Sequence, residues 1–195
     1  MIGSLRGRIA AKTPPQLMID VGGVGYELEA PMSTFFHLPA VGQEVSLLTH
    51  MVVREDAHML YGFATQEERR LFRNLLKVSG VGPKIALALL SGISVEAFAQ
   101  CILNEDVDAL IRVPGIGRKT AERLFVEMRD RVAHLQGGPG TAHGAVASPE
   151  SEALGALIGL GYKPAEAARL LKAVESGVHT TEELIRRALQ GAARD

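Results

Sequence analysis

The residues with the clearest capacity for chemistry are two Gly-x-Gly turns, each followed by a lysine. Gly80 and Gly82 precede Lys84, and Gly115 and Gly117 precede Lys119. Glycines let a ligand approach the backbone closely, and the first turn of a helix carries free N–H groups and a partial positive charge. A lysine one turn into the helix adds a full charge. Each turn therefore predicts a phosphate-binding site that has no group able to read a base edge.

The two turns belong to an internal repeat. Shifting the chain by 35 residues pairs residues 77–86 with residues 112–121, and five of these ten positions are identical. Two copies are too few for a solenoid, so we interpret each copy as a helix, a tight turn and a second helix. Both glycines of each turn are expected to use positive φ angles. The predicted DNA contacts, made mainly through backbone amides, are Gly80, Val81, Gly82, Lys84, Gly115, Ile116, Gly117, Arg118 and Lys119.

A turn that only packs two antiparallel helices is the simpler alternative, because such turns often need glycine. Two copies in register, each followed by lysine, favour phosphate binding. A nucleotide-binding loop is excluded because the spacing G-x-x-x-x-G-K-S/T is missing and neither turn follows a strand-like run. The pattern is that of helix-hairpin-helix motifs in DNA-binding proteins that ignore sequence.

The elements that position these turns fall into regions of different character. Residues 1–63 alternate short apolar runs with turn residues, which predicts a five-stranded OB-fold barrel with one helical turn at 31–36. Residues 64–135 have helical periodicity and predict about five short helices. Residues 136–149 are rich in glycine and lack Asp, Glu, Lys and Arg, which predicts a flexible linker. Residues 150–195 predict a three-helix, UBA-like bundle. The expected fold class is multidomain α+β.

Several residues predict where turns and helices begin. Gly22, Gly23 and Gly25 indicate a tight hairpin with positive φ angles. Capping boxes are expected at Thr65 with Glu68 and at Thr180 with Glu183, and the other predicted N-caps are Ser94, Asn104 and Ser148.

Composition limits the classes of protein that fit. The chain has 195 residues, 21 Lys and Arg, 22 Asp and Glu and one cysteine. A single cysteine excludes a disulfide framework and fits a reducing compartment. A net charge of −1 argues against a protein that coats nucleic acid through bulk positive charge, although residues 63–134 carry a net +2. The sequence shows no membrane span and no secretory signal, so we expect a cytoplasmic protein.

Other chemistry is hard to find in the sequence. The six histidines lack metal-ligand spacing, and no Walker motif or nucleophile–base pair stands out, so we expect no catalysis, cofactor or metal. Cys101 follows an apolar helical face and is expected in a core. Glu55 and Asp56 lie between two strand-like runs and predict the tip of a hairpin, for which a solvated turn is the default interpretation.

These motifs together closely resemble the RuvA family, the DNA-binding subunits of bacterial Holliday-junction branch-migration complexes. The resemblance covers the first 134 residues almost continuously and is looser beyond them. The strings that carry it are DVGGVGY at 20–26, VREDA at 53–57, LYGF at 60–63, GVGPK at 80–84, PGIGRKTAERL at 114–124 and LGYKP at 160–164.

The resemblance implies a homotetramer, alone or as two tetramers around the DNA, that holds a four-way junction open during recombination and repair. It implies that Glu55 and Asp56 form an acidic pin at the junction centre, where carboxylates repel phosphates. It also implies that the C-terminal bundle docks the hexameric ATPase RuvB, and it makes the resolvase RuvC a candidate partner. The matching docking positions, which could instead pack the bundle, are Leu157, Leu160, Tyr162 and Leu189.

Two other functions fit a helix-hairpin-helix protein. A DNA repair enzyme such as a glycosylase or nuclease would need a catalytic Asp or Lys in a pocket, and none stands out. A DNA-associated adaptor would use the C-terminal bundle to bind ubiquitin-like or peptide partners. Binding to a four-way junction and to a linear duplex separates the junction hypothesis from the adaptor hypothesis.

Overall fold

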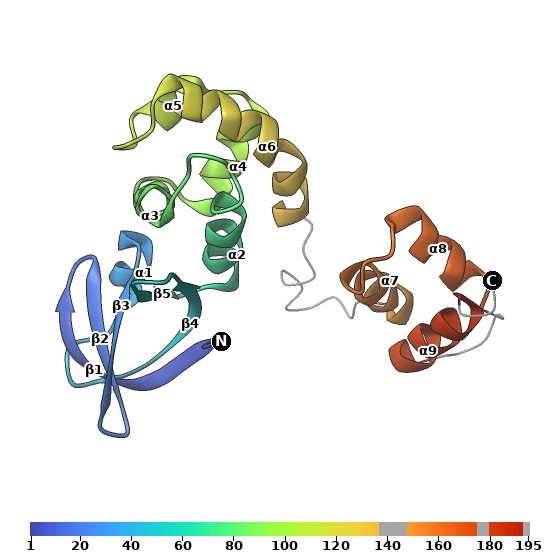
Figure 1. Cartoon of the computed structure of the whole chain (residues 1–195), viewed down its shortest axis with the longest axis horizontal. Coiled ribbons are helices and arrows are strands. Elements are labelled where there is room, and N and C mark those ends of the chain that lie inside the picture. Colours follow the sequence, from blue (N-terminus) through green and yellow to red (C-terminus); the bar gives the residue numbers. More distant parts are fainter. Residues whose placement is uncertain (137–147, 175–179, 193–195) are drawn as a thin grey trace. The chain divides into compact units, whose positions relative to one another are not determined.

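A computed structural model describes residues 1–136, 148–174 and 180–192 (Figure 1). The chain forms two compact units, Met1–Gly138 and Pro139–Asp195. Most of the predicted linker at 136–149 lies outside the described residues. Among the described residues, no single helix is long and apolar enough to cross a membrane. The helices α3 (Pro83–Gly92) and α4 (Val95–Leu103) pass that test only together, with a bend of 99° between them.

Five strands close into a barrel in the first unit, in the order β1-β2-β3-β5-β4, with β4 pairing back to β1. All neighbours are antiparallel except β3 and β5, which pair at Glu29 and Tyr61. The short helix α1, Met32–His37, follows β3 and confirms the predicted helical turn. The strands are β1 Ser4–Thr13, β2 Gln16–Val21, β3 Val24–Glu29, β4 Glu44–Val53 and β5 His58–Phe63. The predicted five-stranded barrel is confirmed.

The hairpin between β2 and β3 uses fewer special glycines than expected. Gly22 and Gly23 have φ angles of +63° and +92°, as predicted. Gly25 does not have a positive φ, because it already lies in β3, where it pairs with Asp20. The expectation for Gly25 was wrong.

Five helices follow in the same unit and lie at one end of the barrel (Figure 1). Thr65 and Glu68 form the predicted capping box, and the Ser94 side chain accepts a hydrogen bond from the Ala97 N–H. Asn104 is not an N-cap: it ends α4, and Asp106 caps α5. The helices are α2 Gln66–Leu75, α3 Pro83–Gly92, α4 Val95–Leu103, α5 Val107–Ile111 and α6 Arg118–Gln136, so α6, with 19 residues, is longer than predicted.

The barrel and the helices are joined through α2. The Phe72 ring is fully buried, with its centroid 5.0 Å from that of Tyr61 and 4.9 Å from that of Phe63. The backbone N–H of Met32, at the start of α1, donates to the Ser91 hydroxyl of α3 at 3.0 Å. Apolar packing and specific hydrogen bonds therefore hold the barrel and the helices as one unit.

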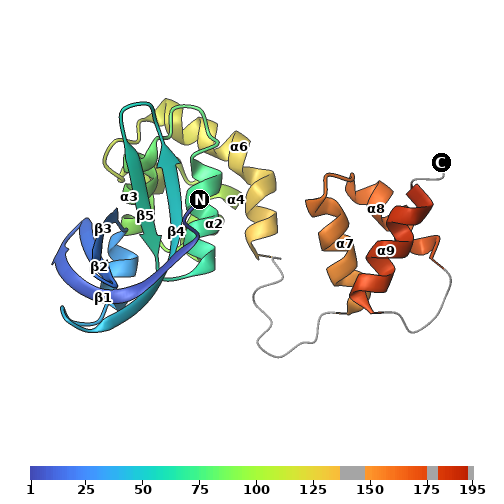
Figure 2. The ribbon, with the colours of Figure 1, turned by 60° about the horizontal axis from the view of Figure 1, so that its bottom comes forward.

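The second unit is a three-helix bundle (Figure 2). Ser148 caps the first helix, as predicted, and Thr180 and Glu183 exchange the two hydrogen bonds of a capping box. Gly161, with φ +104°, follows the first helix and turns the chain. The helices are α7 Pro149–Gly159, α8 Pro164–Lys172 and α9 Thr181–Ala192. With the barrel and the five helices of the first unit, this bundle confirms the expected fold class.

Candidate nucleic-acid interface

The two predicted turns have the same backbone geometry. Gly80 and Gly115 have φ angles of +85° and +88°. The Val81 N–H donates to the Val78 carbonyl at 3.1 Å, and the Ile116 N–H donates to the Val113 carbonyl at 3.1 Å. Because all three pairs are related by the same shift of 35 residues, the repeat in the sequence is also a repeat in structure.

The second glycine of each turn does not have the conformation expected of it. Gly82 has φ −90° and ψ 175°, and Gly117 also lacks a positive φ, because Gly82 is the extended N-cap of α3 and Gly117 holds the same place before α6. A Cβ built on either glycine would meet no heavy atom within 4 Å. The fold does not require glycine at these two positions, and the missing side chains leave the start of each helix open to a ligand.

Val81 and Ile116 anchor the turns from inside. Each side chain is 6% exposed and belongs to the helical core. Their backbone N–H groups already donate within the turns, so neither residue can donate to a phosphate as predicted. In the described part of the chain, the N–H groups of Lys84, Arg118 and Lys119 have no acceptor, as expected for the first turn of a helix. The N–H groups of the four turn glycines, Gly80, Gly82, Gly115 and Gly117, have no acceptor either. These N–H groups are the available donors.

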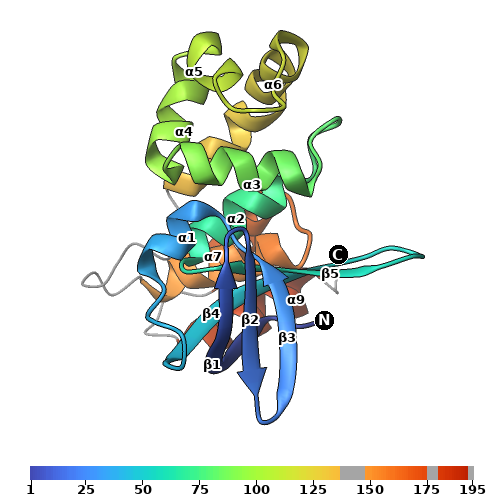
Figure 3. The same ribbon diagram turned by 90° about the vertical axis from the view of Figure 1, so that its left-hand side faces the viewer.

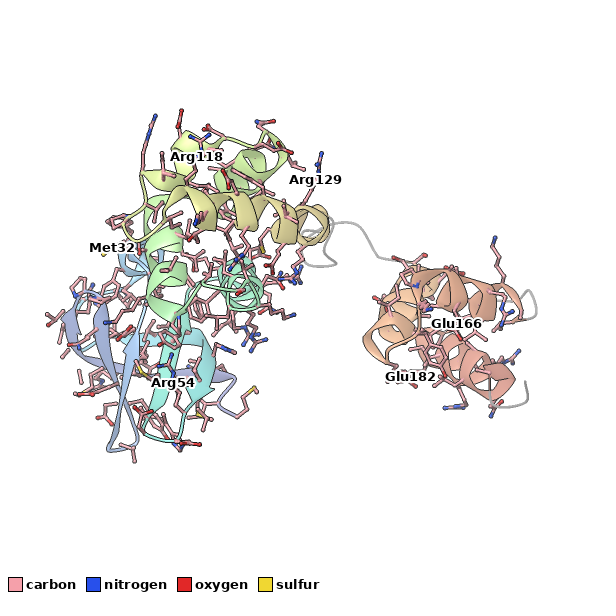
Figure 4. All side chains as sticks on the ribbon, turned by 45° about the horizontal axis from the view of Figure 1, so that its top comes forward. Met32, Arg54, Arg118, Arg129, Glu166 and Glu182 are labelled. Atoms are coloured by element: carbon pink, nitrogen blue, oxygen red, sulfur yellow. The ribbon has the colours of Figure 1, made fainter. Side chains whose placement is uncertain are left out.

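The predicted cations lie on the surface beside these donors. Lys84, Arg118 and Lys119 are exposed. Arg118 pairs with Glu122 at 3.4 Å, but both side chains are mostly exposed, so solvent competes with this pair. Figure 4 shows Arg118, the first residue of α6, and Arg129, which lies further along the same helix. The cationic groups of the second turn are therefore concentrated at the N-terminal end of this helix.

A contact between the two hairpins was not predicted. Nη1 of Arg123, on α6, donates to the backbone carbonyl of Ser79 at 3.0 Å and to its hydroxyl at 3.2 Å. In the opposite direction, a Cβ built on Gly115 would lie 3.6 Å from Cγ1 of Ile85. The repeat could not reveal the arginine, since the shift of 35 residues pairs it with Ala88. Each turn thus contacts the helix of the other hairpin.

The acidic tip lies where the sequence predicted it, between β4 and β5. Val53 pairs with His58, and the Arg54 N–H donates to the Ala57 carbonyl at 2.8 Å, which closes the turn. Glu55 and Asp56 are exposed at its end. Figure 3 shows this hairpin extending away from the barrel. Among the described residues, no group of three or more His, Cys, Asp or Glu could hold a metal ion.

The groups with altered pKa values lie away from the turns and the tip. Burial lowers the pKa of His50, and the charges of Arg73 and Arg69 lower it further. Burial raises the pKa of the Tyr61 hydroxyl and of the Cys101 thiol. The cysteine is half-buried against the helical core, close to the position expected for it. The main cause of these three pKa shifts is burial, because His50, Tyr61 and Cys101 pack within β4, β5 and α4.

The predicted docking residues separate by burial. Leu157 is completely buried in the core of the bundle, so it cannot present its side chain to a partner, and the docking interpretation fails for this residue. Tyr162 and Leu189 are half-buried against the same core. Leu160 is 63% exposed, and Ile158, which the sequence reasoning missed, is 40% exposed. The exposed apolar surface lies at and just after the end of α7.

Comparisons with known protein families agree with this architecture. The family model described as the RuvA N terminal domain matches residues 1–62, which form most of the barrel. The model described as a SAM-like helix-hairpin-helix tandem matches residues 72–130. The model described as the RuvA C-terminal domain matches residues 148–193.

Relatives named Holliday junction branch migration complex subunit RuvA match along the whole chain. The Thioalkalivibrio sulfidiphilus protein is 54% identical over 100% of both chains. The Pseudomonas savastanoi pv. phaseolicola protein is 53% identical, over 98% of this chain and 99% of the relative. A Pseudomonas aeruginosa protein is 51% identical with the same coverage. With three domains in the same order and this identity over the full length, the chain belongs to the RuvA family.

Proposed function

We propose that this chain is the junction-binding subunit of a Holliday-junction branch-migration complex, acting in homologous recombination and DNA repair. The observation that carries the proposal is the pair of equivalent hairpin turns, each with free first-turn amides and at least one exposed cation, in the same unit as an acidic tip. Relatives that bear the name of this complex are 51–54% identical to the chain.

Each hairpin binds one backbone phosphate of a DNA arm. The free N–H groups and the positive end of α3 or α6 face the anion, and Lys84 or Lys119 adds a charge-assisted contact. The open position at Gly82 or Gly117 lets the phosphate reach these amides. Since none of these groups recognises a base edge, binding depends on the DNA backbone and its shape and not on sequence.

Four subunits bind the four arms of one junction. A closed four-fold arrangement repeats the same pair of phosphate sites on each arm, so contacts that are weak singly add to a strong total. Glu55 and Asp56 of each subunit lie at the junction centre and repel phosphates there, which keeps the strands of the crossover apart. One tetramer leaves a face of the junction free for the resolvase RuvC, whereas two tetramers enclose it.

The subunit itself is not catalytic, and ATP hydrolysis belongs to the hexameric partner RuvB. The C-terminal bundle docks this partner through the exposed Leu160, together with the half-buried Tyr162 and Leu189. Leu157 packs in the core of the bundle. The docking surface therefore forms only when this core is folded.

The test compares a synthetic four-way junction with a linear duplex of equal length and composition in a gel-shift titration. The junction is expected to bind about tenfold tighter or more, because only the junction occupies the sites on all four arms at once. Equal affinity would overturn the proposal in favour of a general DNA-binding adaptor. Base release or strand cleavage on damaged or branched DNA would overturn the non-catalytic assignment.

A further inference from the structure

The first hairpin has one cation fewer than the second in its own sequence. The shift of 35 residues pairs Lys84 with Lys119, but it pairs Pro83 with Arg118. The second turn therefore has two cationic side chains at the start of its helix, and the first turn has one. The start of α3 gains a proline at the first helical position and loses a positive charge.

The structure brings a cation to the first turn from the other hairpin. Nη1 of Arg123 lies 3.0 Å from the Ser79 carbonyl oxygen and 3.2 Å from the Ser79 hydroxyl. The same nitrogen would be 3.6 Å from a Cβ built on Gly80. The guanidinium of Arg123 thus lies directly against the tip of the first turn.

Much of this guanidinium is still available for a ligand. Arginine carries five N–H donors, and both bonds to Ser79 come from Nη1. Within the described part of the chain, Nε and Nη2 of Arg123 have no hydrogen-bond acceptor, and the residue makes no ion pair, since the nearby Glu122 pairs with Arg118. The side chain is exposed.

We propose that Arg123 belongs to the phosphate site of the first hairpin, which is therefore built from both hairpins. The inference rests on the proposed function and deepens it. Arg123 supplies to the first site the second cation that Arg118 supplies to the second site, so each site combines one lysine with one arginine. Ser79 holds the guanidinium in place before DNA binds, which reduces the conformational freedom lost on binding.

This arrangement couples the two sites. The residue that completes the first site stands on α6, the helix whose first turn forms the second site. A phosphate bound at the first hairpin thus contacts both hairpins, and the distance between the two sites is set by α6. The pair therefore recognises two phosphates at one fixed separation along a DNA arm.

The experiment measures the affinity of the full-length protein for a four-way junction over a series of KCl concentrations. For Arg123→Gln, the slope of log affinity against log salt should fall in magnitude by about one, and the affinity at fixed salt by about tenfold, for each subunit that contacts DNA. Arg123→Lys keeps the charge and should restore the slope. Ser79→Ala keeps the arginine, so it should weaken binding without changing the slope.

Arg129→Gln is the matched control, since Arg129 is an exposed arginine on the same helix that pairs with Glu105 at 3.4 Å. It should leave the slope unchanged. If Arg123→Gln keeps the parental slope, with or without weaker binding, the arginine only holds the turn and the inference is wrong. If Arg123→Lys fails to restore the slope, the inference is also wrong. The double variant Lys84→Ala with Lys119→Ala is measured in the same experiment. If its salt dependence is weaker than that of the parental protein, the proposed function stands even where the role of Arg123 is contradicted.

Discussion

The Thr34 hydroxyl donates to Oε2 of Glu68 at 2.9 Å, and both side chains are buried where α1 meets α2. The same carboxylate accepts hydrogen bonds from the Ser33 hydroxyl and from the backbone N–H groups of Ala64 and Thr65, at 3.1 and 3.4 Å. The carboxylate of Glu68 thus links α1, which lies between β3 and β4 in the chain, to α2, the first helix after the barrel. It contributes to fixing the acidic tip and the two turns within one unit.

Glu68→Ala should lower the free energy of unfolding of the first unit by about 1–3 kcal/mol, because it leaves the Ser33 and Thr34 hydroxyls without the carboxylate that accepts their hydrogen bonds. Urea denaturation followed by circular dichroism, at one protein concentration, measures the change. Glu67→Ala, one residue earlier on α2, is the control and should change stability by less than about 0.5 kcal/mol. Equal effects of the two substitutions would contradict the role given to Glu68.

Lys84→Ala combined with Lys119→Ala should weaken junction binding and flatten its salt dependence. Two lost phosphate contacts reduce the slope of log affinity against log salt by about two for each subunit that contacts DNA. Lys172→Ala, on the exposed face of α8, is the control and should leave the slope unchanged. Filter binding or fluorescence anisotropy over a range of KCl concentrations measures the slope. An unchanged slope in the double variant would refute the phosphate role of these lysines.

The two glycines of each turn should respond differently to alanine. Gly80→Ala places a side chain at φ +85° and should cost about 1–2 kcal/mol of stability. Gly82→Ala meets open space and should leave stability nearly unchanged, yet it should weaken junction binding by about tenfold, since its Cβ stands where the phosphate approaches. Thermal unfolding and a gel-shift titration measure the two effects. Full junction affinity in Gly82→Ala would contradict this account.

Reversing the charge of the acidic tip, with Glu55→Lys and Asp56→Lys together, should preserve or strengthen junction binding, because two repulsive groups near phosphates become attractive. Branch migration driven by the partner ATPase should change, since the strands at the crossover are no longer repelled. Glu96→Lys, an exposed position on α4, is the control for added positive charge. A large loss of junction binding in the tip variant would count against a pin at the junction centre.

Leu157→Ala and Leu160→Ala should separate packing from docking in the bundle. The first removes a completely buried side chain and should destabilise the second unit by about 2–5 kcal/mol. The second removes a side chain that is 63% exposed, so the bundle should stay folded while the partner ATPase binds more weakly. Circular dichroism and a pull-down with the ATPase measure the two effects. Normal ATPase binding by a folded Leu160→Ala variant would exclude this residue from the docking surface.

Local chemistry in the sequence was enough for many elements. Thr65 with Glu68 and Thr180 with Glu183 predicted helix starts correctly, because a capping box depends on residues three apart. Local chemistry was insufficient at Asn104, where the neighbouring Glu105 takes φ +52° and the N-cap of α5 is Asp106, two residues after the predicted one. Asn104 and Asp106 are two residues apart and each can cap a helix, so packing of the helices on the core decides between them.

The sequence by itself determined the two equivalent turns, because a repeated Gly-x-Gly followed by lysine has the same local consequences in each copy. It could not determine which amides stay free, since Val81 and Ile116 donate within the turns only after their side chains enter the core. Nor could it reveal that Arg123 reaches Ser79, 44 residues away. That contact exists because both hairpins pack on one core, and long-range packing leaves no periodic signal in a single sequence.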